Sequence, residues 1–178
     1  MSAECTLACV RLEEANALGE REFVERFGAV FEHSPWVAER AWKKRPFRSV
    51  GALHEAMMEA VLQAKESERL ALVRAHPELA GAEAKEGTLT SDSSSEQGRL
   101  GFLQLAREEF QQMARLNQRN RERHGFPCVV ALRLHATRSS VLAEMERRVA
   151  NDSTTEMKNA LEQIGHIARG RLARMLDG

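Results

Sequence analysis

The 178-residue sequence contains no tyrosine, has only three cysteines and carries no excess of either charge. The absence of tyrosine removes one common acid–base side chain. Lysine plus arginine and aspartate plus glutamate number 26 each, so the formal net charge is zero. Binding to duplex nucleic acid requires surplus positive charge, and binding to a membrane surface requires a basic cluster. We therefore expect no nucleic acid and no membrane among the partners.

The three cysteines, Cys5, Cys9 and Cys128, are an odd number without paired spacing. A disulfide framework is therefore not expected, and a reducing cytoplasm is the simpler location. Cys5 and Cys9 could form a metal or redox pair, but no second pair of cysteines or histidines has ligand spacing. The alternative is two small residues in an N-terminal segment, and we expect no metal site.

Features that define several other protein classes are missing. No apolar run approaches the roughly 20 residues that span a bilayer. The chain does not open on a charged and then apolar signal segment, and its last residues are not a Ser-Lys-Leu type tail. The Gly-rich phosphate loop, His-Glu-x-x-His and Gly-x-Ser-x-Gly are also absent. We expect a soluble cytoplasmic protein that is not a P-loop nucleotide binder, zinc protease or serine hydrolase.

Apolar residues recur three and four positions apart along most of the chain, which is typical of amphipathic helices. Helices are expected over residues 20–31, 36–42, 50–64 and 67–76. A further helix is expected to begin near residue 95, a longer one to end at residue 125, and two more to begin after residues 137 and 153. Candidate N-cap residues precede most of them: Ser34, Ser49, Ser67, Ser93, Thr137 and Ser153. The sequence predicts one all-α domain over residues 1–178, a bundle of about seven or eight helices.

Two stretches depart from this periodicity. Residues 77–95 are irregular, and residues 126–134 form a short apolar run that is either a strand or a buried extended segment. Irregular segments held by a scaffold often carry function. His76 lies at the end of a predicted helix, where Pro77 stops it and the helix dipole favours a protonated imidazole. Such a histidine is suited to donate a proton, although any one of six histidines is weak evidence alone.

Three other groups of residues have plain structural interpretations. Ser93-x-x-Glu96 is a capping box, although a helix N-terminus can also bind a carboxylate or a planar ureide. A basic run in the predicted helix that ends at Gly125 fits a solvated helix face better than a nucleic-acid surface. Trp36 and Trp42 fit core or dimer-interface positions better than base-stacking platforms. The basic run comprises Arg115, Arg119, Arg121, Arg123 and His124.

Several motifs in order resemble the family of 2-oxo-4-hydroxy-4-carboxy-5-ureidoimidazoline (OHCU) decarboxylases. The motifs are Glu32-His33-Ser34-Pro35-Trp36 to Trp42, Arg74-Ala75-His76-Pro77-Glu78-Leu79-Ala80-Gly81, Gly87-Thr88-Leu89-Thr90, Ser93-x-x-Glu96-Gln97, Leu116-Asn117 with Arg121-x3-Gly125-Phe126-Pro127, and Glu146 to Asp152. No single motif is decisive, but their common order and spacing cover essentially the whole chain.

The resemblance implies an all-α, dimeric, cofactor-free enzyme that converts OHCU to (S)-allantoin during urate degradation, with functional coupling to 5-hydroxyisourate hydrolase. It assigns His76 as the proton donor and Glu96 as a second catalytic carboxylate. The residues that it assigns to substrate binding are Pro77, Ser93, Ser94, Ser95, Glu96, Gln97, Cys128, Val129, Val130, Ala131, Leu132 and Arg133. Arg133 is expected to pair with the departing carboxylate.

One residue departs from the family pattern. Many members have phenylalanine after Phe-Pro, where this chain has Cys128, so we expect a looser wall of the substrate site. Two other functions remain open: a different lyase or hydrolase acting on a cyclic ureide, and a helical interaction module without activity. A product assay separates the first, and retention of both His76 and Glu96 argues against the second.

Overall fold

The computed structural model describes residues 10–177, and these form ten α-helices, two 3₁₀ segments and one pair of two-residue strands. The all-α prediction is confirmed, with two or three more helices than expected. The chain divides into two compact units, one formed by residues up to Ala64 together with those from Ala168 onward, and one formed by Lys65–Ile167. The last helix, α10 (Ser153–Met175), contributes residues to both units.

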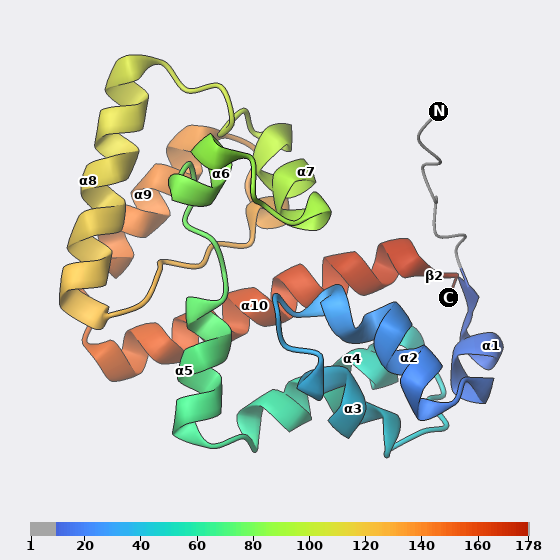
Figure 1. The fold of residues 1–178 in the computed structure, drawn as a ribbon. Helices are drawn as coiled ribbons and strands as arrows, with labels where there is room; N and C mark the ends of the chain where they lie inside the picture. Colours follow the sequence, from blue (N-terminus) through green and yellow to red (C-terminus); the bar gives the residue numbers. More distant parts are fainter. Residues whose placement is uncertain (1–9, 178) are drawn as a thin grey trace, which may run out of the picture. The chain divides into compact units, whose positions relative to one another are not determined.

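The first unit contains the N-terminal helices and the end of α10 (Figure 1). Its elements are β1 (Val10–Arg11), α1 (Leu12–Ala17), α2 (Glu20–Phe27), the 3₁₀ segment Gly28–Val30, α3 (Trp36–Trp42), α4 (Val50–Leu62) and β2 (Leu176–Asp177). Strands β1 and β2 pair in parallel, with Val10 opposite Leu176. The apolar face predicted for residues 20–31 is confirmed, because the four side chains that form it are buried: Phe23, Phe27, Val30 and Phe31.

A buried ion pair joins the two sequence segments of the first unit. Arg171 on α10 donates from Nη2 to Oε1 of Glu32 at 2.9 Å, and from Nη1 to the carbonyl of Val30 at 3.4 Å. The side chains of Arg171 and Glu32 are each 2% exposed. Because both charges are shielded from water, each depends on the other for its stability.

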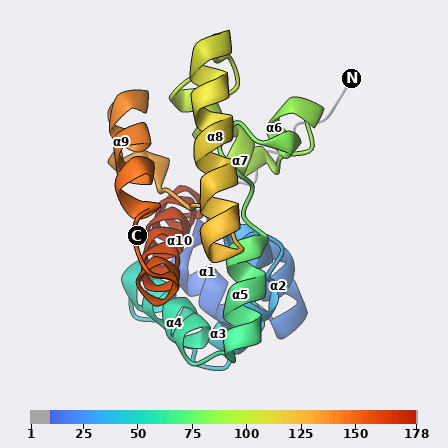
Figure 2. The same cartoon turned by 90° about the vertical axis from the view of Figure 1, so that its left-hand side faces the viewer.

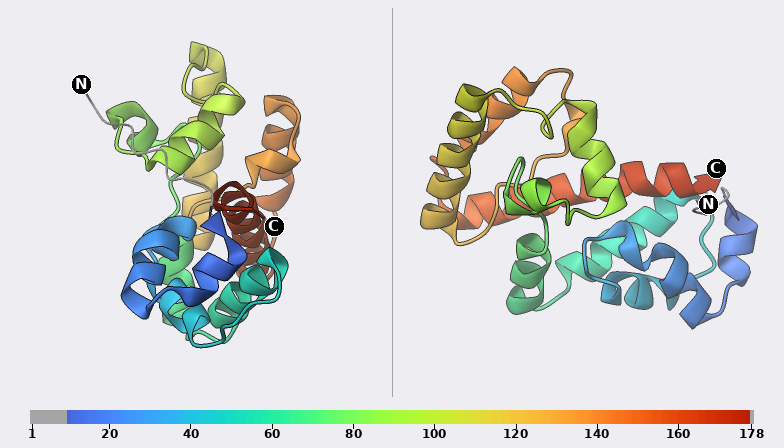
Figure 3. Two further views of the ribbon diagram at one scale, coloured as in Figure 1. Left: turned by 90° about the vertical axis from the view of Figure 1, so that its right-hand side faces the viewer. Right: turned by 45° about the horizontal axis from the view of Figure 1, so that its top comes forward.

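The second unit contains the helices that follow Ala64 and the first part of α10 (Figure 2). Its further elements are α5 (Glu66–Arg74), α6 (Ala82–Glu86), α7 (Ser91–Arg99), α8 (Arg107–His124), the 3₁₀ segment Leu132–Leu134 and α9 (Arg138–Arg148). Helices α8 and α9 lie side by side in the views of Figures 2 and 3. One cluster of buried residues in this unit comprises Leu79, Ala80, Phe102, Met113, Leu116, Cys128, Val130, Leu132, Val141 and Met145.

Several predicted helix ends are confirmed. The hydroxyl of Ser49 accepts a hydrogen bond from the Ala52 N–H, and that of Thr137 accepts one from the Ser140 N–H. Helix α8 ends at Gly125, whose φ of +74° is readily adopted by glycine. These ends are predictable because the cap and its partner lie within one helical turn.

Four predicted N-caps are wrong. Helix α3 begins at Trp36 after Pro35, without a side-chain cap from Ser34. Helix α5 begins after Lys65, where the Glu68 carboxylate accepts the Lys65 N–H, so Ser67 lies inside the helix. Thr90 caps α7 in place of Ser93, and Asp152 accepts from the Thr155 N–H in place of Ser153. For α7 and α10 the side chain of a neighbouring residue supplies the acceptor, and for α5 the acceptor is the side chain three residues into the helix.

Residues 126–134 are not a strand. Phe126 to Ala131 are buried and run outside helix and sheet, and a 3₁₀ turn follows. A buried extended segment is one of the two alternatives that the sequence allows, and this alternative is confirmed. The run is apolar on every residue because both of its faces are covered.

Three further expectations have different outcomes. Trp36 and Trp42 are half-buried, and the guanidinium groups of Arg40 and Arg45 stack over their rings, so neither tryptophan is a core residue. Within residues 10–177, no helix is both long and apolar enough to cross a bilayer. The proposed pair of Cys5 and Cys9 lies outside the described residues.

Candidate active site

His76 lies two residues after Arg74, the last residue of α5, close to where the sequence predicts the helix to end. Its N–H still donates to the carbonyl of Val73 at 3.2 Å, and its side chain is 5% exposed. The ring nitrogen Nδ1 lies 2.9 Å from the carbonyl oxygen of Leu72. A carbonyl only accepts, so Nδ1 carries the hydrogen, and any exchange of a proton with a ligand would take place at Nε2.

The segment after His76 is fixed by side chains from other helices. Gln97 on α7 accepts the Ala80 N–H through Oε1 at 2.9 Å and donates from Nε2 to the Glu78 carbonyl at 3.4 Å. Asn117 on α8 donates to the carbonyl of Leu79 at 2.9 Å. These bonds hold the backbone of residues 78–80 and thereby limit the motion of the adjacent histidine.

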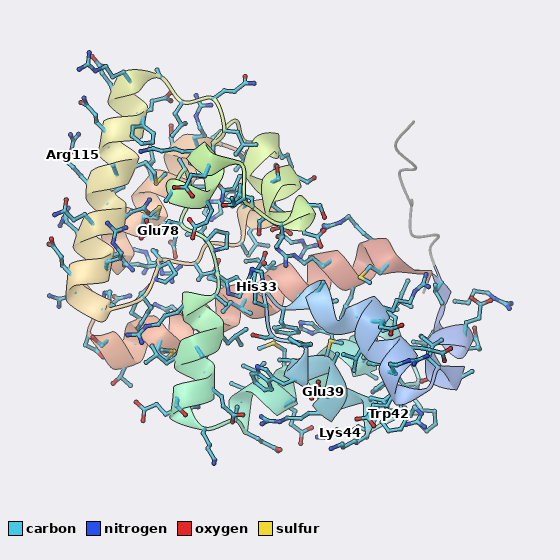
Figure 4. The ribbon with its side chains drawn as sticks, in the orientation of Figure 1. His33, Glu39, Trp42, Lys44, Glu78 and Arg115 are labelled. Carbon is cyan, nitrogen blue, oxygen red and sulfur yellow. The ribbon has the colours of Figure 1, made fainter. Side chains whose placement is uncertain are left out.

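Arg121 on α8 fixes the same segment through an ion pair with Glu78. Figure 4 labels Glu78 on the connection between α5 and α6, and shows Arg115 pointing away from α8. The solvated helix face predicted for the basic run is confirmed for its four exposed arginines, but Arg121 also has this specific partner.

The close turn at residues 78–81 explains the glycine in its sequence. Ala80 has a φ of +50°, which is uncommon for a residue with a side chain. A Cβ atom on Gly81 would lie 2.8 Å from the Cβ of Glu78 and 3.1 Å from its carbonyl oxygen. Only glycine fits there without a shift of the backbone that carries the histidine.

Helix α7 carries the predicted Ser93–Gln97 segment in its interior, although its first turn still contains Ser93. Ser93 and Gln97 are 5% and 3% exposed, Ser94 and Glu96 are half-buried, and Ser95 is exposed. Because Gln97 is engaged with residues 78 and 80, one residue of this segment has a positioning contact that the sequence did not indicate. Its role in binding substrate stays a prediction.

The extended segment lies in the same unit and joins the other two predicted site segments through shared packing. Cys128, Val130 and Leu132 belong to the buried cluster that contains Leu79 and Ala80. Arg99, two residues after Gln97, donates to the carbonyl of Leu132 and, at 3.1 Å, to that of His135. The second unit therefore brings together the His76–Gly81, Ser93–Gln97 and Cys128–Leu132 segments.

One edge of the extended segment is bound by protein groups. The carbonyl of Val129 accepts from Nη1 of Arg148 at 2.7 Å, and the Ala131 N–H donates to Oε1 of Gln163 at 2.9 Å. The intervening Val130 is 4% exposed, and its N–H and C=O have no hydrogen bond among residues 10–177. Successive residues of an extended chain direct these groups to opposite edges. Val130 therefore presents one donor and one acceptor on the opposite edge.

Arg133 has a different environment from the one predicted for a substrate ligand. Its side chain is exposed, whereas the arginine that binds the end of the extended segment is Arg99. Pairing of Arg133 with a carboxylate stays a prediction. Sequence reasoning missed Arg99, Asn117 and Arg148, because their partners are backbone groups 19 to 38 positions away, which local patterns do not indicate.

Cys128 is a buried free thiol beside a charged pair. Its Sγ lies 3.9 Å from Oε1 of Glu156, and the residue is 3% exposed. Burial raises the pKa of this thiol to about 12, and the Glu156 carboxylate acts in the same direction while Arg148 opposes it. The thiol is therefore protonated near neutral pH and is a poor nucleophile.

We expect Cys128 to resist alkylation in the folded protein. Iodoacetamide at pH 8, followed by peptide-resolved mass spectrometry, should leave Cys128 unmodified, because the thiolate is scarce and water is excluded. The same treatment in urea should modify it fully, which provides the control. Rapid modification under native conditions would contradict this account of its environment.

Comparison with known proteins gives this constellation a family. A family model described as OHCU decarboxylase matches residues 16–173. The chain belongs to the OHCU decarboxylase family.

Within residues 10–177 no group of three or more His, Cys, Asp or Glu side chains could hold a metal ion.

Individual relatives agree with this assignment. A 2-oxo-4-hydroxy-4-carboxy-5-ureidoimidazoline decarboxylase of Haloferax volcanii is 41% identical, over 91% of this chain and 94% of its own length. A uric acid degradation bifunctional protein of Bacillus sp. is 37% identical, over 92% of this chain and 32% of its own length. The crystal structure of an (S)-allantoin synthase is 28% identical and superposes with a TM-score of 0.75, over 94% of this chain and 55% of that one.

Proposed function

We propose that this member of the OHCU decarboxylase family decarboxylates OHCU and protonates the product on one face, giving (S)-allantoin. The observation that carries the proposal is the family's His-Pro-Glu-Leu segment, with His76 buried at the end of α5 and the following backbone held by α7 and α8. The region over which the 41% identical decarboxylase matches spans nearly the whole of both chains.

The chemistry of the substrate is consistent with catalysis by side chains alone. When the C4 carboxylate leaves as CO₂, the electron pair of the broken bond forms a double bond to the ureido-bearing carbon. The electron pair of the ring imine passes to its nitrogen, which takes a proton. The resulting enol then takes a proton at the ureido-bearing carbon and loses its hydroxyl proton. The protein must hold this geometry and supply the proton from one side.

We assign proton delivery to Nε2 of His76, because Nδ1 is occupied by the Leu72 carbonyl. Glu96, half-buried on α7, would accept a hydrogen bond from the 4-hydroxyl or the ureido N–H groups. Pro77 and the Ser93–Ser95 turn would line the ring. These roles follow from the chemistry of the side chains and the family resemblance.

The backbone of the extended segment would recognise the ureido group. A ureido group has donors and acceptors side by side, and Val130 presents a donor and an acceptor on one edge. Buried backbone polar groups that have no protein partner are uncommon, so they favour a ligand at this edge. The predicted site residues Cys128 to Leu132 would thus act mainly through their main chain.

The proposal extends to assembly and cellular context. We propose a homodimer in which residues 1–178 form a single functional domain, working in the cytoplasm, where a reducing environment suits the free Cys128. Coupling to 5-hydroxyisourate hydrolase is supported by the similarity to bifunctional proteins of uric acid degradation. The hydrolase acts in the step before decarboxylation, so it would deliver the short-lived substrate to this enzyme.

The test generates OHCU in situ from urate with uricase and 5-hydroxyisourate hydrolase, and follows allantoin by circular dichroism. Spontaneous decay gives racemic product, so a fast dichroic signal of one sign is expected only with an active enzyme. Without acceleration over the blank, the proposal fails, and a different cyclic ureide becomes the substrate to test.

A further inference from the structure

The extended segment is held by a buried charged cluster that no substrate role explains. Arg148 on α9 contacts Glu156 on α10 through Nε at 3.0 Å and Nη2 at 2.6 Å, both to Oε1. Asn151 donates to Oε2 of Glu156 at 3.0 Å. Arg148 and Glu156 are both 0% exposed. A charge pair without solvent contact is costly to form. Besides the contact between Glu156 and the Cys128 thiol, the remaining side-chain hydrogen bond of the pair is donated by Arg148.

That remaining hydrogen bond is to the backbone of the proposed substrate edge. Nη1 of Arg148 binds the Val129 carbonyl, and two residues on, Gln163 binds the Ala131 N–H. The donor comes from α9 and the acceptor from α10, so the segment is fixed at two points on the same edge. Rotation about its long axis would break both bonds and turn the Val130 groups away from their direction.

We propose that Arg148 and Gln163 are positioning residues that set the orientation of the Val130 N–H and C=O toward the ureido group, and so determine which face of the enol receives the proton. This inference rests on the proposed function. Glu156 and Asn151 hold Arg148 in place, and none of these residues contacts substrate. Loss of either anchor leaves His76 unchanged but lets the substrate bind in more than one orientation.

The test measures KM, kcat and the enantiomeric excess of allantoin for Gln163→Leu and Arg148→Lys. Gln163 is half-buried on α10, so its variant is expected to fold. Loss of one anchoring hydrogen bond should raise KM roughly tenfold and lower the enantiomeric excess. Gln163→Glu keeps an acceptor for the Ala131 N–H and should restore both values.

Controls separate positioning from stability. Arg147→Met removes the neighbouring exposed arginine of α9, which pairs with Glu144, and should leave KM and enantiomeric excess unchanged. Val141→Ala destabilises the core of the same helix and should lower only the amount of folded enzyme. An active Gln163→Leu enzyme with wild-type KM and enantiomeric excess overturns the inference. An inactive wild-type enzyme overturns the proposed function instead.

Discussion

The variant His76→Asn should retain its fold and lose about 10²- to 10⁴-fold in kcat, the usual contribution of a positioned general acid. Asparagine keeps a side-chain N–H that can satisfy the Leu72 carbonyl, so the end of α5 is preserved. It has no nitrogen that titrates, so it cannot deliver the proton. The rate would be measured by circular dichroism on freshly generated OHCU.

The matched control for this experiment is His135→Asn. His135 lies in the same unit, is half-buried and contacts the hydroxyl of Ser140 through Nδ1 at 2.9 Å. Its replacement is expected to leave kcat within a factor of two, because His135 belongs to none of the three site segments. A factor of two corresponds to about 0.4 kcal/mol in activation free energy. Full activity in His76→Asn would remove the histidine from the mechanism.

The second large effect concerns stability. Arg171→Met should lower the free energy of unfolding by about 3–5 kcal/mol, because Glu32 would remain buried without its partner. Urea unfolding followed by far-ultraviolet circular dichroism measures this loss. The double variant Arg171→Met with Glu32→Leu removes both charges and should recover most of the lost stability.

The control is Arg147→Met, whose ion pair with Glu144 is largely exposed to solvent on the arginine side. Its urea midpoint should stay close to that of the wild type, because water screens exposed pairs. A double variant as unstable as the single Arg171 variant would show that the loss comes from packing, and not from the missing guanidinium charge beside Glu32.

The fold was predictable from periodicity because helices obey a local rule. The faces around Phe23 and Val141 follow from spacings of three and four residues, and both are buried as expected. The position of His76 was equally predictable, because a residue that precedes proline is disfavoured in the helical region, and helices usually end there.

Capping was predicted less well, because the same residue types serve several purposes. Ser153-x-x-Glu156 has the spacing of a capping box, yet Asp152 caps the helix and Glu156 pairs with Arg148, a residue of the preceding helix. The contact between Glu78 and Arg121 spans 43 positions. Such partners are fixed by packing in three dimensions, which no local window of sequence contains.

The assignment of α10 to both units has a consequence for biosynthesis. The first unit needs its β2 partner for Val10 and its Arg171 for Glu32, and both lie in the last part of α10 or directly after it. Those contacts span 139 positions or more, so their loops close only after α10 has been synthesised. Residues 65–167 form a continuous unit that can fold before the rest of α10 has been synthesised. Until α10 is complete, the N-terminal helices have an incomplete core, and this nascent stage is when the protein is most exposed to aggregation and to chaperones.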